Sequence, residues 1–354
     1  MKNVVSTVSR RSFLAGAVGA VAAPMVIRAS RAAAKSDSLT FTGYGGSYQE
    51  NLTKFAINPF TEETGIKVNV VPAPDLARVK AQLLTGNVEW DVFDGNGAQM
   101  ASGSKQGYWE KLDLSMLDVE DLAIPPASDS VAWGAYGSGY IWDPKKFGDG
   151  KHPSTCAEFF DVKKFPGRRS LRTGAFGNLE AALLADGVSP KEMYPLDIDR
   201  AFKAMDRIKP SIAVWATTNP QSISLVQTGE VDFSVSFGNR VKSTNDPGGG
   251  VPLAFSFEQN LLDYEGLAIL KGAPNKENAM KFIAYLLRPE VQARLNNELG
   301  GSVPASKKAL PMIKPEIRKW QVDLNNPKSL FLDAAYWADH REAVEQRFKE
   351  WILT

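Results

Sequence analysis

The fold is decided by residues 38–71, which read SLTFTGYGGSYQENLTKFAINPFTEETGIKVNVV. Residues 38–42 alternate polar and apolar side chains, which predicts a strand, and the glycine-rich turn GYGGS follows at 43–47. Apolar residues then recur at three- and four-residue spacing, so we expect a helix that ends at Gly65. Residues 66–71 alternate again. A strand, a helix and a second strand at this spacing indicate parallel pairing and an α/β fold.

The remaining chain continues to alternate strand-like and helix-like segments. Its length of 354 residues suggests two domains rather than one. Residues 132–140 are rich in small and aromatic side chains, and we interpret them as a crossover into a second lobe. Further strands are expected at 91–93, 170–172, 231–237 and 267–270, and further helices at 76–84, 179–185, 197–208, 275–287 and 333–352.

The first 34 residues have the three-part pattern of an export signal. Ser9-Arg10-Arg11-Ser12-Phe13-Leu14 precedes a short apolar run, and Ala32-Ala33-Ala34 offers small residues for cleavage. The paired arginines resemble a twin-arginine signal, whereas the alternative is a short basic helix with an apolar face. The apolar run is shorter than the roughly 20 residues that span a bilayer. We therefore expect export by the twin-arginine machinery, removal of residues 1–34 and a periplasmic location.

Composition and charge exclude several classes of protein. The net charge is +1, and the basic residues of the first 34 positions leave a slightly acidic body, so we expect no nucleic-acid partner. The single Cys156 cannot form an internal disulfide or a multi-cysteine metal site. His152 and His340 lie far apart, and neither a Gly-x-Ser-x-Gly elbow nor a phosphate loop is present. We therefore expect no catalytic residues, no metal ligands and no cofactor, and thus no enzyme.

Polar, aromatic and glycine residues gather where the expected strands lead into helices. In α/β sheets, ligands lie beyond the carboxyl ends of strands, where helix N-termini present free N–H groups. Glycines there allow close backbone approach, and aromatic rings suit an apolar or cationic group. Two of these residues are expected just before the strand at 267–270. The candidate binding residues are Tyr44, Ser47, Asn96, Tyr136, Gly174, Phe176, Phe237, Asn239, Arg240, Tyr264 and Glu265.

An ordered set of segments resembles the extracellular solute-binding proteins related to the spermidine/putrescine-binding components of ABC importers. The segments are FTEETGIKV (60–68), WDVF (90–93), GEVD (229–232), FGNRV (237–241), KGAPNKE (271–277), LRPEV (287–291) and GGSVP (300–304). The resemblance covers nearly the whole chain beyond the signal. It implies a two-lobed α/β fold, the type II-like periplasmic binding protein fold, with a ligand cleft between the lobes.

The resemblance also implies an organisation and a set of partners. Lobe one would comprise residues 38–136 plus 258–325, and lobe two residues 137–257. Residues 326–354 would form a C-terminal helix that packs across the lobes. Such a protein would be a monomer that captures a small solute, closes around it and docks on the permease of an ABC importer.

Two charged residues suggest what kind of solute is bound. Glu265 matches a position where polyamine binders carry a carboxylate for an ammonium group, and a surface or hinge salt bridge is the alternative. Arg240 matches an arginine of the broader family, and its guanidinium would suit a ligand carboxylate unless it forms an ion pair between the lobes. Together they suggest a ligand with both an amine and an acid group, and they leave open whether the two residues contact the ligand or each other.

Departures from the family pattern argue against a polyamine. The loop at 173–178 has no acidic residue where polyamine binders have them. Phe237 and Asp263 stand where tryptophans are expected, and Gly301 where a tyrosine is expected. A doubly charged amine would be held poorly, because a desolvated ammonium without a partner is costly. The alternatives that remain are a ferric-ion or other small-anion binder of the same fold and an exported enzyme.

Overall fold

The structure is a computed structural model that describes residues 37–354, apart from residues 45 and 73. Asp37–Thr354 forms a single unit. The predicted export signal at 1–34 lies outside the described residues. Within the described residues, no helix is long and apolar enough to cross a membrane.

A mixed sheet organises the unit. Its strands are β1 (Ser38–Gly43), β2 (Lys67–Pro72), β3 (Val92–Asn96), β4 (Ser130–Trp142), β7 (Ser234–Phe237), β8 (Ala254–Phe255), β9 (Leu261–Ile269), β10 (Val303–Pro304) and β11 (Leu330–Phe331). The main order is β10-β4-β9-β3-β1-β2, with β7 and β8 on β4 and β11 on β9. Strand β1 pairs in parallel with β2 and β3, which confirms the parallel pair expected at 38–71. A second, two-stranded sheet is formed by β5 (Arg169–Arg172) and β6 (Ile212–Ala216).

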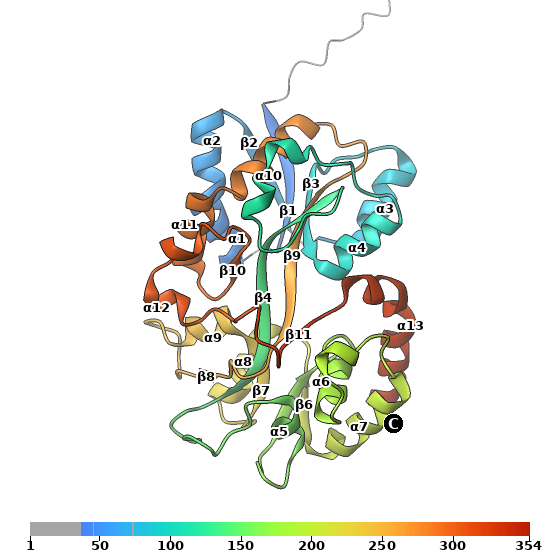
Figure 1. Ribbon diagram of the computed structural model, residues 1–354, viewed down its shortest axis with the longest axis vertical. Coiled ribbons are helices and arrows are strands. Elements are labelled where there is room, and N and C mark those ends of the chain that lie inside the picture. The colour runs from blue at the N-terminus through green and yellow to red at the C-terminus, as the bar shows by residue number, and fades with distance from the viewer. Residues whose placement is uncertain (1–36, 45, 73) are drawn as a thin grey trace, which may run out of the picture. The chain divides into compact units, whose positions relative to one another are not determined.

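Strands β4 and β9 are long and connect two groups of elements. They pair antiparallel from Ser130 to Ser138, and β4 then continues to pair with β7 and β8. Figure 1 shows both strands running from the group around β1–β3 to the group around β5–β8. The segment expected to be a crossover thus lies entirely within β4.

Helices flank both groups of strands (Figure 1). The α-helices are α1 (Gly46–Leu52), α2 (Asn58–Thr64), α3 (Leu76–Thr85), α4 (Gly97–Lys105), α5 (Cys156–Phe160), α6 (Asn178–Ala185), α7 (Ile198–Ile208), α8 (Asn219–Gln227), α9 (Gly238–Thr244), α10 (Lys276–Leu286), α11 (Pro289–Leu299), α12 (Pro315–Arg318) and α13 (Ala334–Leu353). A π-helical turn at Thr53–Ile57 joins α1 to α2, and 3₁₀ turns lie at Leu114–Met116, Val119–Asp121, Pro190–Glu192, Lys209–Ser211 and Leu310–Met312. Helix α2 ends at Gly65, whose φ of 73° is the left-handed conformation expected of a C-cap glycine.

Each group of elements has its own apolar core. In the first, the alternation of β1 buries Leu39 and Phe41, and the Phe41 ring meets Phe282 of α10 edge-on at 5.5 Å. In the second, the rings of Phe159 and Phe233 flank the fully buried guanidinium of Arg169. These cores fix the strand ends on which the cleft is built.

The C-terminal helix α13 contacts both groups. Asp339 forms an ion pair with Lys105 of α4. Nearer its end, Arg347 pairs with Asp199 of α7 at 2.7 Å. The helix is therefore a third connection, besides β4 and β9, between the two groups (Figure 1).

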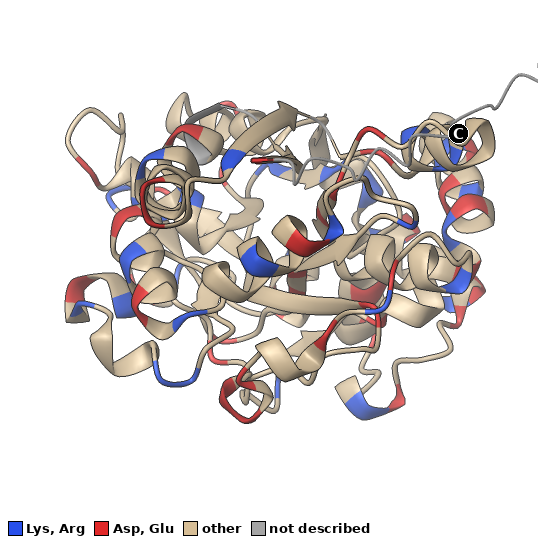
Figure 2. Ribbon diagram, turned by 90° about the horizontal axis from the view of Figure 1, so that it is seen from above, with Lys and Arg blue, Asp and Glu red and all other residues tan. Residues whose placement is uncertain are grey.

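Charged residues of both signs are interspersed in one view of the unit (Figure 2). Lys and Arg alternate with Asp and Glu around the view of Figure 2, and no face in that view gathers a single sign. The functional chemistry must therefore be sought in a local site.

Candidate functional site

Two adjoining cavities lie along the middle of the unit. One has a volume of about 290 Å³ and the other about 350 Å³. Both are lined by Asn96, Tyr136, Asn219 and Phe237, so they form one cleft with a constriction between them. Tyr136 and Phe237 meet edge-on with ring centroids 5.4 Å apart, and this aromatic pair forms the constriction.

One wall of the cleft is a row of side chains on the paired strands β4 and β9. Residues directly opposite each other in an antiparallel pair share a face, and so does every second residue along a strand. The pairs in this row are Gly134 with Glu265, Tyr136 with Asp263 and Ser138 with Leu261. The row therefore places two carboxylates on the same face as the aromatic constriction.

A β-bulge in β4 turns one more side chain toward this row. The register between β4 and β9 shifts between Ala132 and Gly134, which leaves Trp133 as the extra residue. Bulges of this kind re-aim a side chain beside functional sites. Trp133 lines the larger cavity, and its Nε1 donates to Oδ1 of Asp94 at 3.1 Å.

Asp263 is a buried carboxylate at the acidic end of the smaller cavity. Its side chain accepts hydrogen bonds from Tyr136 Oη at 3.2 Å, from Gly97 N at 3.3 Å and from its own neighbour Tyr264 N at 2.8 Å. Gly97 is the first residue of α4, so the helix N-terminus also favours a negative charge here. Burial outweighs these bonds and raises the pKa of Asp263 to about 6.

Glu265 forms the acidic end of the larger cavity. Tyr44 Oη donates to its Oε2 at 3.0 Å. Burial, followed by the nearby charges of Asp94 and Asp263, raises the pKa of Glu265 well above its ordinary value. Three carboxylates thus crowd together at this side of the cleft, and a cation would relieve their mutual repulsion.

Two arginines form the basic end of the cleft. Arg172, at the end of β5, donates to Oδ1 of Asn219 and to the carbonyl of Thr217, the latter at 3.2 Å. Arg240 of α9 lines the larger cavity. Within the described residues, neither guanidinium forms an ion pair with a carboxylate. Burial and then the charge of Arg240 lower the pKa of Arg172, which indicates that the two cations lie near each other.

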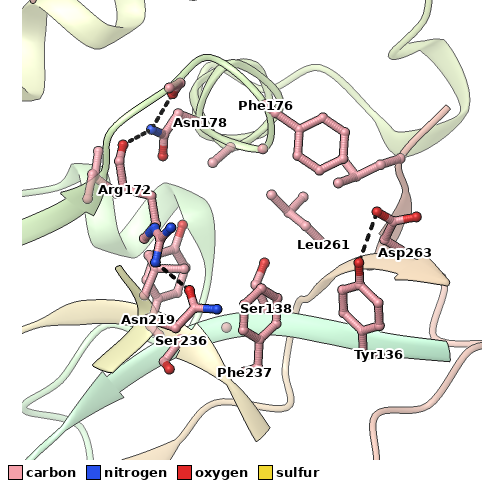
Figure 3. Close-up of a pocket in the computed structure, with 18 of the residues that line it drawn as sticks. Tyr136, Ser138, Arg172, Phe176, Asn178, Asn219, Ser236, Phe237, Leu261 and Asp263 are labelled. Atoms are coloured by element: carbon pink, nitrogen blue, oxygen red, sulfur yellow. Dashed lines mark hydrogen bonds between the residues drawn. The ribbon is translucent and has the colours of Figure 1, made fainter. Parts of the chain in front are cut away.

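Figure 3 shows Arg172 and Asp263 on opposite sides of the smaller cavity, whose lining also includes Arg341 and Glu345. Arg172 and Asn219 lie at one side, Tyr136 and Asp263 lie at the other, and the side chain of Leu261 stands between. A small molecule with a cationic end and an anionic end would meet a matching group at each side.

The loop after β5 closes one side of this cavity and is held from two directions. Asn178, the first residue of α6, donates to the carbonyl oxygens of Arg172 and Gly174 at 2.6 and 2.8 Å. Glu345 of α13 accepts hydrogen bonds from the backbone N–H groups of Ala175 at 3.0 Å and Phe176 at 3.3 Å. Gly174 has a φ of 127°, which side chains rarely allow, so glycine suits this loop.

Most residues predicted from the sequence meet in this cleft. Those that line it are Tyr44, Asn96, Tyr136, Gly174, Phe176, Phe237, Asn239, Arg240 and Glu265. Nine positions spread over the chain from 44 to 265 are thereby brought together. The side chain of Ser47 lies outside the described part of the structure.

Tyr264 does not line either cavity. We expected it in a loop before a strand at 267–270, but β9 begins at Leu261, so Tyr264 is within the strand. Successive residues of a strand point to opposite faces, and Tyr264 packs behind the wall while its neighbours Asp263 and Glu265 face the cleft. The strand was missed at its start because these carboxylates interrupt the apolar pattern.

Several cleft residues were not proposed from the sequence. Arg172 ends a strand that the sequence predicted, and Asn219 begins a helix, α8, that it did not predict. Arg341 and Glu345 lie on α13. The sequence signal for Asn219 was present, because Thr218 followed by Asn219-Pro220 is a good helix start. Asp263 was noted only as a departure from the family pattern, and the structure places it in the wall of the cleft.

The cleft offers no cluster of metal ligands. Among residues 37–354, described without 45 and 73, no group of three His, Cys, Asp or Glu side chains is arranged to bind a metal ion. Cys156 lines the smaller cavity, but burial raises the pKa of its thiol to about 12, which keeps it protonated at neutral pH.

The fold and the cleft define a class of protein, and comparison with known families agrees. The chain belongs to the bacterial extracellular solute-binding proteins, whose family pattern matches residues 56–323. Its architecture is the two-lobed α/β fold of periplasmic binding proteins, with the cleft beside the strands that join the lobes.

Several members of this class with named ligands are similar to the chain. The chain is 31% identical to the gamma-aminobutyric acid-binding protein of Pseudomonas aeruginosa, over 91% of this chain and 93% of that one. It is 27% identical to the spermidine/putrescine-binding periplasmic protein of Salmonella typhimurium, over 86% of each chain. The solved structure of the Atu4243-GABA receptor superposes with a TM-score of 0.81 at 33% identity and covers 89% of this chain and 97% of that one.

Proposed function

We propose that this protein captures a small zwitterionic solute of the ω-amino-acid type in the periplasm and delivers it to the permease of an ABC importer. The single observation that carries the proposal is the separation of charge across the cleft, with Asp263 and Glu265 at one end and Arg172 and Arg240 at the other. The ligand ammonium would lie between the two carboxylates. The ligand carboxylate would lie against the two guanidinium groups, for which carboxylates are geometrically suited partners.

The span of the cleft fits a short chain between the two charges. Glu265 lies opposite Gly134, and Phe237 lies opposite Ser138, four residues further along β4. Four strand residues cover about 13 Å, and Arg240 follows Phe237 by three positions. The aromatic pair of Tyr136 and Phe237 would pack against the methylene groups between the charges.

The relatives support a ligand with one amine and one acid group. The gamma-aminobutyric acid-binding protein and the GABA receptor are more similar in sequence to this chain than the spermidine/putrescine-binding protein of Salmonella typhimurium is. A diamine would bring a second ammonium against Arg172 and Arg240, and the like charges would repel.

Residues 38–136 plus 258–325 and residues 137–257 are proposed as the two lobes, with α13 as a strap across them. Ligand contacts with both ends of the cleft would stabilise a closed form that the permease recognises. Export by a twin-arginine signal and a monomeric state are part of the same proposal.

Thermal unfolding and isothermal titration calorimetry with a matched set of solutes test the proposal. 4-Aminobutyrate should raise the melting temperature and bind with a measurable heat, because ligand binding to the folded state stabilises it. Putrescine, which lacks the acid, and butyrate, which lacks the amine, should each have a smaller effect. Stronger stabilisation by putrescine than by 4-aminobutyrate would contradict the assignment of the basic end.

A small-anion binder is the second candidate function, because the two guanidinium groups have no carboxylate partner among the described residues. Succinate and inorganic phosphate, added to the same set of solutes, distinguish it. For an anion binder, these anions should raise the melting temperature and give a heat of binding, whereas the amine of 4-aminobutyrate should add nothing to its binding.

A further inference from the structure

Asp94 is a buried carboxyl group beside the acidic end of the cleft. It lies on β3, two residues before Asn96, which pairs with Glu265. Alternation along β3 therefore puts Asp94 on the same face as the cleft carboxylates. Its side chain is 0% exposed.

The hydrogen bonding of Asp94 is incomplete. Oδ1 accepts one bond, from Nε1 of Trp133 at 3.1 Å. Oδ2 is buried and has no hydrogen-bond partner among the described residues. A buried carboxylate with one bond is expensive to keep charged, so burial raises the pKa of Asp94 to about 7.

The surroundings of Asp94 supply no direct counter-charge. Its titratable neighbour is Glu265 of β9, whose pKa the charge of Asp94 raises, and Glu265 in turn lies near Asp263 of β9 and Tyr44 of the turn after β1. Tyr136 of β4 lies near Asp263 and Glu265, and the cations of the cleft are Arg172, Arg240 and Arg341. Within the described part of the chain, none of the three carboxyl groups is in an ion pair. Three negative charges in this cluster would repel one another, which favours protonation of at least one carboxyl group when no cation is bound.

We propose that Asp94 is a positioning residue that couples capture of the solute to release of a proton. While the cleft is empty, the cluster of Asp94, Asp263 and Glu265 retains a proton. When a ligand ammonium enters between Asp263 and Glu265, that proton passes to water, so one positive charge leaves as another arrives. Asp94 touches no ligand, and it acts by setting how many negative charges its neighbours can carry. The inference rests on the proposed function for the identity of the cation.

Binding of an ammonium group should then depend on pH with a defined sign. At pH 5 the carboxyl groups of the cluster are largely protonated and offer the ammonium group fewer negative charges, so affinity for 4-aminobutyrate is low. Affinity should rise with pH, by up to about tenfold per pH unit while one proton is released, and level off above about pH 7 to 8. The ligand amine stays charged throughout this range because its pKa lies near that of lysine, about 10.

Calorimetry in two buffers of different ionisation enthalpy counts the protons directly. At pH 7, wild-type protein should release a fraction of a proton on binding 4-aminobutyrate. Asp94→Asn, which has the same shape without the charge, should release fewer and show a flatter pH profile. The matched control is Asp118→Asn, which removes an exposed carboxylate and should leave the proton count unchanged. An unchanged proton count in Asp94→Asn would overturn the proposal.

A second measurement needs no ligand and separates the two proposals. The folded-state pKa of Asp94 lies above its ordinary 3.8, so the folded protein holds a proton that the unfolded chain has lost. The stability associated with this proton is present at low pH and is lost as pH rises from about 4 through 7. Between pH 5 and pH 8, the melting temperature of unliganded wild type should therefore fall relative to Asp94→Asn. If the difference in melting temperature between wild type and Asp94→Asn is the same at pH 5 and pH 8, the inference is overturned even if 4-aminobutyrate binds. If 4-aminobutyrate does not bind, the proposed function fails, but this test of Asp94 still applies.

Trp133→Phe provides a check should Asp94→Asn fold poorly. Removing the indole N–H takes away the one hydrogen bond that lowers the pKa of Asp94. The midpoint of the stability profile should then move to higher pH. A midpoint that stays in place would show that Asp94 does not carry the titration.

Discussion

At the residue scale, the cleft depends on charges that have few partners in the protein itself. Glu265 receives one hydrogen bond from Tyr44 at 3.0 Å and lies close to two other carboxyl groups. Such a group gains more from an incoming ammonium than a carboxylate already in an ion pair, because its neighbours do not satisfy it.

Glu265→Gln should weaken binding of 4-aminobutyrate by about 10- to 100-fold, because a hydrogen bond to a charged group contributes about 1.5–3 kcal/mol. Titration calorimetry at pH 8, where the cluster is least protonated, measures the change. Glu63→Gln removes an exposed carboxylate that pairs with Arg288 on the surface and should leave affinity unchanged. Equal affinity of Glu265→Gln and wild type would remove Glu265 from the site.

Arg240→Met tests the opposite end of the cleft. Arg240 makes no hydrogen bond or ion pair with any described residue, so its loss should leave the melting temperature of the unliganded protein nearly unchanged. Affinity for 4-aminobutyrate should nevertheless fall about tenfold or more, because a ligand carboxylate would lose a guanidinium partner. A variant that binds normally but melts earlier would indicate a structural role instead.

At the element scale, α13 controls the loop that borders the smaller cavity. Glu345 accepts hydrogen bonds from two backbone N–H groups of this loop, those of Ala175 and Phe176. The ring of Phe176 is in turn enclosed between Trp337, at 5.2 Å, and the guanidinium of Arg341, at 5.3 Å. The C-terminal helix therefore shapes a site whose wall strands, β4 and β9, lie more than 60 residues earlier.

Glu345→Ala should loosen residues 174–178 and lower global stability by only about 1–2 kcal/mol, because two partly buried N–H groups lose their acceptor. Hydrogen–deuterium exchange followed by mass spectrometry should show faster exchange in this loop. Glu342→Ala, at an exposed position of the same helix, is the matched control. Unaltered exchange in the loop would mean that α13 does not hold it.

Arg169, the first residue of β5, also holds backbone groups in place, but from within the apolar core. Its guanidinium donates to the carbonyl oxygens of Phe159 at 2.8 Å and Gly167 at 2.6 Å, and also to that of Phe165. Arg169→Met should lower the free energy of unfolding by about 3–5 kcal/mol, because three carbonyl groups lose their donor in an apolar environment.

Urea denaturation measures this loss of stability. Lys164→Met removes an exposed cation whose ion pair with Glu158 spans 3.7 Å, and it should change stability by less than about 1 kcal/mol. A small effect of Arg169→Met would mean that water replaces the arginine and that the core of this lobe is open.

At the scale of the whole molecule, the two groups of elements are joined by β4, β9 and the strap formed by α13. We expect the cleft to close around a ligand that contacts both ends. Small-angle X-ray scattering of the chain without residues 1–34 should show a smaller radius of gyration with saturating 4-aminobutyrate than without it. Saturated binding without any change in radius would argue for a rigid cleft.

Much of the architecture was predictable from local patterns. The alternation in residues 38–42 and 66–71, the helix between them and its end at Gly65 all correspond to observed elements. Such patterns are local, because side-chain direction repeats every two residues in a strand and every 3.6 in a helix. Strand ends that carry glycine, asparagine or aromatic residues likewise marked most of the cleft.

The composition of the site beyond those residues depended on the packed chain. Arg172 and Asp263 are separated by 91 positions and share a cavity only because β4 and β9 cross between the two groups of elements. Trp133 reaches Asp94 only because of the bulge in β4, and Arg341 reaches the cavity only because α13 packs against α4. Strand order, strand register and helix docking depend on contacts between residues far apart in the sequence, so no local pattern encodes which charged side chains meet. Periodicity and turn residues are local, and they encode the class of fold directly.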